Sequence, residues 1–409
     1  MIFIPPLPVS VDDAPHSLPV ELWRHIFRLA TAEKNPHMFE TEYFPFQSSG
    51  YWPSHSHATA LNLSRVSKQW RALAAEFLFR RVFVNRGAQG LLRSLKGSMQ
   101  SEGYGRYVRR LELHSMPVNH NTADPIRLLD ILACCPHLQI LDKRAFSGRQ
   151  DHEFWSGLTP ASQPQTNRGL LTSLKRLDWS CSGDPEFRTP GPNIFAFADL
   201  LFCSPNLRHL SVLWQPIGIP HTVHFSLTTL HLNEYMGLGQ AGIQRGDAPN
   251  LIHVVCHPNN LVLDQDDSSV LVLGPQLRVV ELLHTFGTIS TVGTNFFKQC
   301  PNLQAFAYHV GSPQLQPLDV LQHLELKRVN LQIVSFNFLL ERYVGEGSLW
   351  EMLRQQLANF SAHTFPALEH IVLHGDWDPL TQDDRFRPLR QLVLDRGCLL
   401  EYPDGAPVQ

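Results

Sequence analysis

A short phrase built around proline and leucine recurs along the chain and constrains its fold more than any other feature. It reads Cys-Pro-His-Leu at 135–138, Ser-Pro-Asn-Leu at 204–207, Ala-Pro-Asn-Leu at 248–251 and Cys-Pro-Asn-Leu at 300–303. Each copy leads into a short run of alternating apolar residues with the pattern Leu-x-x-Leu-x-Leu or a conservative variant. Such recurrence indicates one small structural unit copied many times, rather than a single closed domain.

The full pattern starts at eleven positions, at a mean interval of about 28 residues, close to the length of a leucine-rich repeat. The last Leu-x-Leu of each start predicts a short strand, because alternate side chains point to one face. One strand cannot bury its apolar face alone, so neighbouring strands must stack into a continuous core. We therefore expect an α/β fold, an irregular leucine-rich-repeat solenoid with a curved parallel sheet and helices or loops on its convex side. The starts are Val108, Leu138, Leu174, Leu207, Leu227, Leu251, Leu277, Leu303, Leu321, Leu368 and Leu389.

Segments between these strands predict the helices of the convex side. Apolar residues recur at helical spacing over 126–133, 193–202 and 337–362. The third segment explains the long interval between Leu321 and Leu368 as an inserted helical unit. Its predicted apolar face consists of Leu340, Val344, Leu353, Leu357 and Phe360.

The N-terminal segment has a different, purely helical pattern. Pro19 precedes an amphipathic stretch, as suits the first turn of a helix, where a missing N–H costs nothing. A second amphipathic stretch runs from about Thr59 to Phe79. Apolar faces of this size often lie in the groove of a partner protein. The stripe of the second stretch consists of Val66, Trp70, Leu73 and Phe77.

Two parts of this segment resemble an F-box. The opening reads LPVELWRHIF at 18–27, the close reads VSKQWRALA at 66–74, and a typical continuation, FLFRRV, follows at 77–82. F-boxes are normally compact, whereas here a polar and aromatic insert at 35–58 separates the two halves. The resemblance covers 17–82 for the box, followed by irregular leucine-rich repeats over 108–396.

The resemblance implies a substrate-recognition subunit of a Skp-cullin-F-box ubiquitin ligase. In that family the box binds the Skp-family adaptor, and through it a cullin, while the repeats hold a target protein. The alternative is a non-degradative interaction scaffold with a degenerate F-box, and the insert at 35–58 is its motivation. Carried over by position, the adaptor-binding residues are Leu18, Pro19, Leu22, Ile26, Val66 and Trp70.

These features together predict five segments. They are a disordered tail at 1–16, an F-box-like helical domain at 17–82 with an inserted loop at 35–58, a connector at 83–107, the solenoid at 108–396 and a C-terminal tail at 397–409.

Charge and cysteine usage exclude several classes of function. The net charge is −3, so no broad basic field is present for nucleic-acid phosphates. No apolar run reaches the roughly 18 residues that a membrane span needs. Seven cysteines are scattered without a Cys-x-x-Cys pair, which favours reduced thiols in a cytoplasmic or nuclear protein.

Patterns typical of catalysis are weak or missing. A Gly-x-Gly-x-x-Gly motif occurs at 237–242, but only five residues follow before Ala248 and the next repeat, too few for a phosphate-binding helix. No zinc-protease, nucleophile-elbow or P-loop pattern occurs. We therefore expect a non-catalytic protein without a metal or cofactor.

Strand residues that alternate with the apolar ones face outward and should line the concave surface. Nine of the 21 histidines fall on these positions. Either histidine is simply tolerated on an exposed strand, or target binding changes between about pH 6 and 7.5 as this face gains charge. The same alternation places Arg110, Glu112, Arg176 and Asp178 on this surface. The predicted target-binding face consists of His209, His231, His253, His257, Glu281, His309, His323, Glu325, His370 and His374.

Overall fold

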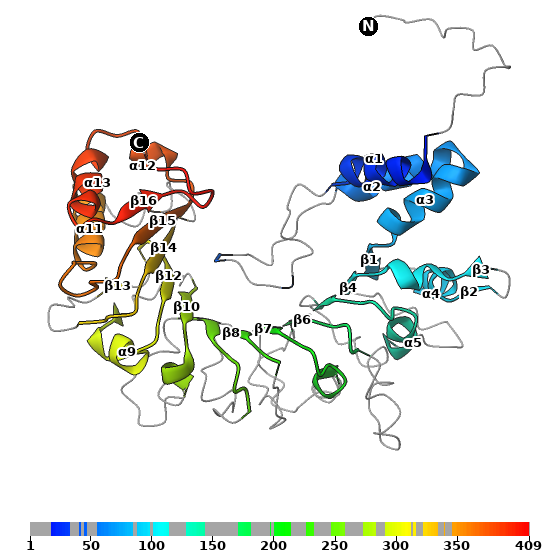
Figure 1. Ribbon diagram of the computed structural model, residues 1–409, viewed down its shortest axis with the longest axis horizontal. Coiled ribbons are helices and arrows are strands. Elements are labelled where there is room, and N and C mark those ends of the chain that lie inside the picture. The colour runs from blue at the N-terminus through cyan, green and yellow to red at the C-terminus, as the bar shows by residue number, and fades with distance from the viewer. Residues whose placement is uncertain are drawn as a thin grey trace, which may run out of the picture.

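The protein forms an arc built on one curved sheet, with helices at both ends and along the outer side (Figure 1). Twelve parallel strands lie in the order β1-β4-β5-β6-β7-β8-β9-β10-β12-β14-β15-β16. The expected α/β fold with a curved parallel sheet is confirmed. The computed structural model describes residues 18–32, 41, 45–46, 55–84, 88–98, 101–113, 128–143, 171–180, 197, 200–213, 226–232, 247–257, 273–283, 291–311, 314–315, 322–333, 339 and 346–408.

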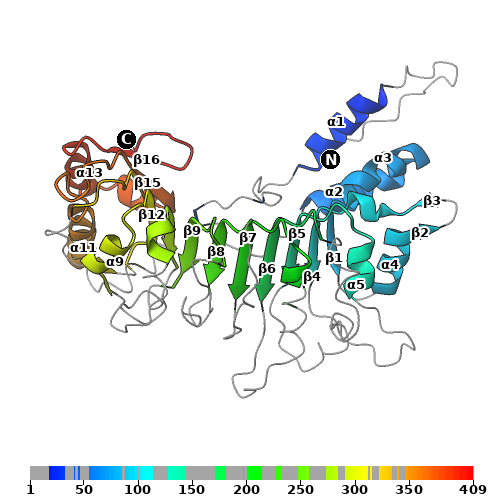
Figure 2. The ribbon, with the colours of Figure 1, turned by 60° about the horizontal axis from the view of Figure 1, so that its bottom comes forward.

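Neighbouring strands of the sheet follow one another along the chain, so each repeat contributes one strand (Figure 2). The strands are short, because each carries only the few residues of one apolar alternation. Their bounds are β1 Arg81–Val84, β4 Arg110–Leu113, β5 Ile140–Lys143, β6 Arg176–Ser180, β7 His209–Leu213, β8 Thr229–Leu232, β9 His253–Cys256, β10 Val279–Leu282, β12 Ala305–His309, β14 Arg328–Ile333, β15 His370–Gly375 and β16 Leu399–Glu401.

The core runs the length of the array behind the sheet. In register, Leu111, Leu141, Leu177 and Leu210 form one continuous buried row across β4 to β7. Each such leucine contributes about 1.5–3 kcal/mol when fully buried. Lys143 takes an apolar slot in the next row, where its Nζ lies 4.6 Å from the centre of the Trp179 ring.

Each copy of the recurring proline phrase forms the turn that leads into the strand after it, namely β5, β7, β9 and β12. The N–H of Leu207 donates to the carbonyl of Ser204 (3.2 Å), and the N–H of Leu303 donates to that of Cys300 (3.1 Å). The asparagine of the phrase ties neighbouring repeats together. Asn206 Nδ2 donates to the Thr172 carbonyl at 2.8 Å. The Pro-Asn-Leu phrase therefore sets both the turn and the spacing of the repeats.

The register of two C-terminal repeats differs from the predicted one. Val329 pairs with Phe306 and Leu331 with Tyr308, so this repeat starts at Leu326 rather than at Leu321. The start at Leu389 is wrong, because that residue lies in helix α13 (Phe386–Leu394). Leucines spaced three apart also fit one side of a helix, so the pattern alone does not separate the two structures.

Both ends of the sheet extend beyond the predicted array. β1 begins at Arg81, within the segment predicted as helical domain and connector, and pairs with β4. At the other end β16 pairs with β15, although its residues fall in the predicted C-terminal tail. Ordered structure continues to Val408, whose N–H donates to the Leu400 carbonyl at 3.0 Å.

The C-terminal residues fold back along the last strand. The N–H of Gly405 donates to the Tyr402 carbonyl (2.9 Å), and Tyr402 donates to Ala406 (2.8 Å). Glu401 forms an antiparallel bridge with Pro407. This reversal covers the outer edge of β16 with the chain itself.

Short helices cover the outer side and the far end of the arc (Figure 1). The predicted helices at 126–133 and 337–362 correspond in the described residues to α5 and α11. At 193–202, Phe197 and 200–202 are helical. Within the described part of the chain, no helix is long and apolar enough to cross a bilayer. The bounds are α4 Ala88–Lys96, α5 Leu128–Ala133, α9 Thr294–Gln299, α11 Glu346–Ala358, α12 Asp378–Thr381, and the 3-10 helices η2 Tyr104–Tyr107 and η5 Gly274–Gln276.

Two further sheets have two strands each, and a glycine allows one close backbone approach. β2 (Gly97–Ser98) pairs with β3 (Ser101–Glu102), and β11 (Thr291–Val292) pairs with β13 (Gln314–Leu315). A Cβ at Gly105 would lie 1.8 Å from the Cys134 carbonyl oxygen. Only glycine allows this approach of η2 to the turn after α5.

Three helices form a separate small core at the β1 end of the arc. They are α1 (Val20–Ala30), α2 (His55–Val66) and α3 (Lys68–Leu78), and Phe27 is fully buried between them. The predicted single stretch from Thr59 to Phe79 is broken at Ser67, whose hydroxyl accepts a hydrogen bond from the N–H of Trp70 as a helix N-cap. α2 begins inside the predicted insert at 35–58.

Candidate protein-binding surfaces

An exposed apolar stripe runs along α1. Its residues recur at helical spacing, and their exposed fractions are 41% for Leu18, 48% for Leu22, 41% for Ile26 and 65% for Leu29. Val66, at the end of α2, is 62% exposed. Of twelve large exposed hydrophobic residues in the described part of the chain, six belong to this small helical unit. Such a concentration of exposed apolar side chains is typical of protein-interaction surfaces.

The predicted adaptor residues therefore separate into two groups. Leu18, Pro19, Leu22, Ile26 and Val66 are exposed. Their sixth member, Trp70, packs inward, with its ring centre 4.9 Å from that of Trp23 and 5.0 Å from that of Phe27. Trp70 is half-buried and packs α3 against α1.

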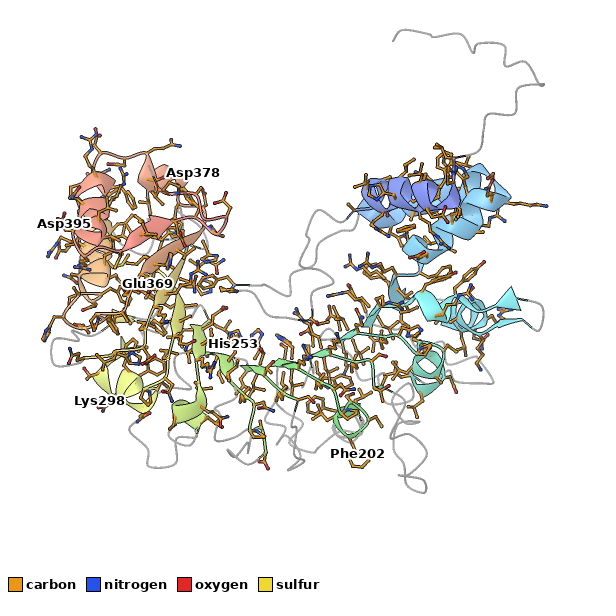
Figure 3. The ribbon with its side chains drawn as sticks, viewed as in Figure 1. Phe202, His253, Lys298, Glu369, Asp378 and Asp395 are labelled. Atoms are coloured by element: carbon orange, nitrogen blue, oxygen red, sulfur yellow. The ribbon has the colours of Figure 1, made fainter. Side chains whose placement is uncertain are left out.

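The second surface is the concave face, which we define as the strand positions that alternate with the core residues on the inner side of the arc. Figure 3 shows His253 on this inner side, whereas Lys298 and Phe202 lie on the outer side. One row of this face crosses the strands through Arg110, Arg176, His209 and His253. The next row includes Glu112, Asp142, Asp178, Ser211, His231, Glu281 and Asn330.

The expectation that the concave face is exposed is wrong for most of its predicted residues. His209, His253, His257, Glu281 and His309 are buried. His231, His370 and His374 are half-buried. Strands only about 4.8 Å apart bring the side chains of one row into contact across the concave side. The face is therefore packed rather than open.

From β1 to β5, the concave face is a chain of buried ion pairs. Arg81 Nε donates to Glu112 Oε1 at 2.7 Å, and Arg110 Nε donates to the same oxygen at 2.6 Å. Arg110 also reaches Asp142, with 2.7 Å between Nη2 and Oδ2. These four residues come from three neighbouring strands, so the ion pairs join the strands sideways.

The chain of charges continues on β6 and β7. Arg176 Nε donates to Asp178 Oδ2 at 2.8 Å, and His209 Nε2 lies 3.5 Å from Asp178 Oδ1. We call the residues Arg81, Arg110, Glu112, Asp142, Arg176, Asp178 and His209 the charged ladder.

Electrostatics within the charged ladder favour the ionised forms of Asp178 and Glu112. Burial raises the pKa of Asp178, but Arg176 and a hydrogen bond from His209 outweigh burial and hold the pKa below its ordinary value. Burial likewise raises the pKa of Glu112, and hydrogen bonds and charge from Arg81 and Arg110 lower it by more. Buried charges are tolerated here because each has a partner of opposite sign.

The neighbouring histidines are held neutral. Burial, reinforced by His209, lowers the pKa of His231 to about 3. Burial, with His209 and His231 adding to it, lowers the pKa of His253 to about 3. Burial also lowers the pKa of His209, against the opposing effect of Asp178. His231 and His253 therefore stay neutral between pH 6 and 7.5.

Toward the C-terminal end, the concave face contacts a residue from outside the array. The N–H of Phe46 donates to Glu281 Oε2 at 2.9 Å. Its ring packs edge-to-face against His309 and His374, with centroid distances of 5.2 and 5.0 Å. His374 Nε2 donates to Asn330 Oδ1 at 3.1 Å. We call Glu281, His309, Asn330 and His374 the aromatic site.

Two predicted face residues lie elsewhere, because the repeat register there is shifted. His323 is buried in the turn before β14, where its Nε2 lies 2.9 Å from the Cys300 carbonyl and its ring contacts Phe297 and Phe365. Glu325 is exposed in the same turn. The shifted register places Arg328 and Asn330 on the concave side instead.

His370 pairs with a residue that the prediction did not include. Its Nδ1 lies 3.1 Å from Glu401 Oε1, and Arg328 Nη2 lies 3.0 Å from the same oxygen. Arg81 was missed as well, although Phe79-x-x-Val82-x-Val84 repeats the array pattern and would have revealed β1. Phe46 lies 235 residues from Glu281, and no local pattern signals that contact.

The described residues hold no group of three or more metal-ligating side chains. The Gly-x-Gly-x-x-Gly motif at 237–242 lies outside the described residues. The carboxylates of the charged ladder pair mainly with arginines, whereas Glu281 accepts a hydrogen bond from Phe46.

A scan against protein-family models found no match to this sequence, and a search of curated proteins found no similar sequence.

Proposed function

We propose that this chain is the substrate-recognition subunit of a Skp-cullin-F-box ubiquitin ligase. In this role the helices α1 to α3 act as an F-box that binds the Skp-family adaptor. The parallel array acts as a leucine-rich-repeat solenoid that holds a target protein on its concave side. The chain contributes no bond chemistry and raises the effective concentration of target lysines near activated ubiquitin.

The observation that carries this proposal is the exposed apolar stripe on α1. Leu18, Leu22 and Ile26 match the F-box opening in sequence and are each about two-fifths to half exposed. A small helical unit gains nothing by leaving these side chains in water, since burying one contributes about 1.5–3 kcal/mol. Their exposure is accounted for if a partner covers them.

The array supports the second half of the proposal. Strands of a solenoid present one long surface on which a protein can lie. Here that side ends in the aromatic site, which already contacts a residue from outside the repeats. A receptor for a target needs such a surface at a fixed distance from the adaptor.

Adaptor capture by the full chain tests the proposal. Purified Skp-family adaptor should bind the wild-type chain, and Leu22→Asp or Ile26→Asp should weaken binding by about 30-fold or more, as central interface residues do. The matched control is Leu324→Asp, because Leu324 is also an exposed leucine (61%) but lies in the turn before β14. It should leave adaptor binding unchanged.

The alternative, a scaffold with a degenerate F-box, predicts no adaptor binding by any of these chains. The insert that motivates it contains Phe46, which contacts the concave face and not the α1 stripe. Failure of the wild-type chain to bind the adaptor would favour the scaffold. Equal loss with Leu324→Asp would show that the stripe is not the binding surface.

A further inference from the structure

The contact between Phe46 and the aromatic site joins parts of the chain that are far apart in sequence. Phe46 belongs to the segment between the two halves of the F-box-like unit, whereas Glu281 lies on β10 and His374 on β15. The contact uses one backbone N–H and one aromatic ring. Both are features that an aromatic residue of any peptide can present.

Phe46 adopts a backbone conformation that is unfavourable for its residue type. Its φ is +59°, and among the described residues no other non-glycine residue has a positive φ. L-residues adopt this left-handed region at a cost, so the surroundings must fix them there. Here the fixed points are the hydrogen bond to Glu281 and the two ring contacts. The aromatic site therefore imposes its geometry on its occupant.

The aromatic site is built from polar groups that are themselves held in place. Glu281 and Asn330 are each 2% exposed, so a carboxylate that accepts an N–H lies within a nearly dry environment. Asn330 accepts from His374 Nε2 and so orients that ring. Burial, with Arg328 adding to it, lowers the pKa of His374 to about 4. The ring is neutral at pH 7 and suits edge-to-face packing.

We propose that Glu281, His309, Asn330 and His374 form a receptor for one aromatic residue of a target peptide, and that Phe46 is an internal competitor that occupies it in the free chain. A target binds by placing its own aromatic ring between the two imidazoles and donating its N–H to Glu281. The inference rests on the proposed target-binding role of the array, but not on adaptor binding. An intramolecular segment acts at an effective concentration up to the millimolar range, so only a peptide with further contacts displaces it.

Peptide binding to the full chain with and without Phe46 tests the inference. The probe is a fluorescently labelled peptide, EYFPFQSS, which copies residues 42–49. Fluorescence anisotropy should show it binding the Phe46→Ala chain at least about tenfold more tightly than the wild-type chain, because the internal competitor is gone. A peptide with alanine in place of the residue that copies Phe46 should bind neither chain.

Two further variants, each made in the Phe46→Ala background, locate the binding. Glu281→Gln removes the charged hydrogen-bond acceptor, and His374→Ala removes one of the two imidazoles that contact the ring. Each should weaken peptide binding by about tenfold. His370→Ala is the matched control. His370 lies on the same strand β15 and is also half-buried, but its Nδ1 faces Glu401. It should leave peptide affinity within about twofold.

Three outcomes overturn the inference. They are peptide affinities for the wild-type and Phe46→Ala chains within about twofold, no binding to the Phe46→Ala chain at peptide concentrations up to about 1 mM, and equal binding of the alanine peptide. Circular dichroism of each variant shows that it is folded, and His374→Ala gives the answer if Glu281→Gln does not fold. Adaptor capture by the Phe46→Ala chain separates this result from the proposed function, since it should equal capture by the wild-type chain.

Discussion

The two ends of the concave face satisfy their buried polar groups in opposite ways. From β1 to β7, the charged ladder pairs its own arginines with its own carboxylates, as Arg110 does with Glu112 and Asp142. From β10 to β15, Glu281 instead accepts a hydrogen bond from Phe46, a residue outside the array. In the first region the buried charges pair with residues of the array itself, whereas in the second region Glu281 accepts from a residue outside the array.

This difference separates buried polar groups that stabilise the fold from buried polar groups that can bind another residue. A buried charge without a partner is costly, so the charged ladder must stay intact for the fold to persist. The aromatic site keeps its geometry through His374 and Asn330 and can exchange one occupant for another. Burial alone therefore does not distinguish the charged ladder from the aromatic site. What distinguishes them is whether the partner of the buried group belongs to the array or to another part of the chain.

The largest effect is expected from breaking the charged ladder. Arg110→Ala removes one ion-pair partner of Glu112 and one of Asp142, and it should lower the free energy of unfolding by about 3–5 kcal/mol in urea titrations. Replacing Arg81, Arg110, Glu112 and Asp142 together by apolar residues of similar size should recover most of that loss, because these four residues form the ion pairs with one another. A single variant as stable as the wild type would show that the ladder is not structural.

A smaller effect is expected from acid. The pKa values of Asp178 and Glu112 are lowered on folding, so their contribution is present above the ordinary carboxyl pKa near 4 and is lost as pH falls through the folded value. Urea unfolding between pH 7 and pH 3 should show stability falling with pH. Asp178→Asn should flatten that dependence, because asparagine does not titrate. If the unfolding free energy of Asp178→Asn changed with pH as steeply as that of the wild type, the lowered pKa of Asp178 would not be a source of this dependence.

His374→Ala should have a modest effect on stability. It removes one edge-to-face contact and the hydrogen bond to Asn330, which together contribute about 1–2 kcal/mol. Its cost in urea titrations should be well below that of Arg110→Ala, although both residues lie on one face. Similar losses of unfolding free energy for His374→Ala and Arg110→Ala would contradict the distinction between the aromatic site and the charged ladder.

The smallest effect is expected from Phe46→Gly. It loses two ring contacts, at about 0.5–1.5 kcal/mol each, and relieves a left-handed conformation that costs about 1–2 kcal/mol. The net change in unfolding free energy should stay below about 1 kcal/mol, measured by the same titration. A large loss would make Phe46 part of the core rather than an exchangeable occupant.

Much of the sheet follows from local pattern. Nine of the predicted starts enter a strand in the expected register, because alternation and the preceding turn act within a few residues. The failures have physical reasons. Leu321 and Leu326 both offer a leucine at the right spacing, and only pairing with β12 selects Leu326. At Leu389 the spacing fits a helix as well as a strand, and a helix forms.

The concave face shows the limit of prediction from local sequence pattern. Alternation correctly places Arg110, Glu112 and His209 on the inner side, but their burial depends on partners one strand away. Whether a histidine is neutral depends on that packing and not on its position in a repeat. The contact of Phe46 depends on the path of a long segment, which composition does not specify.

The reversal of the chain after β16 has a consequence for assembly. An open parallel sheet grows by adding strands at its edge, and the edge of the last strand would accept a strand from another molecule as readily as one of its own. Here the chain turns at Tyr402 to Ala406 and returns to bond Val408 to Leu400. That short turn occupies the outer edge of β16, so the edge is not free to pair with a strand of another copy of the protein.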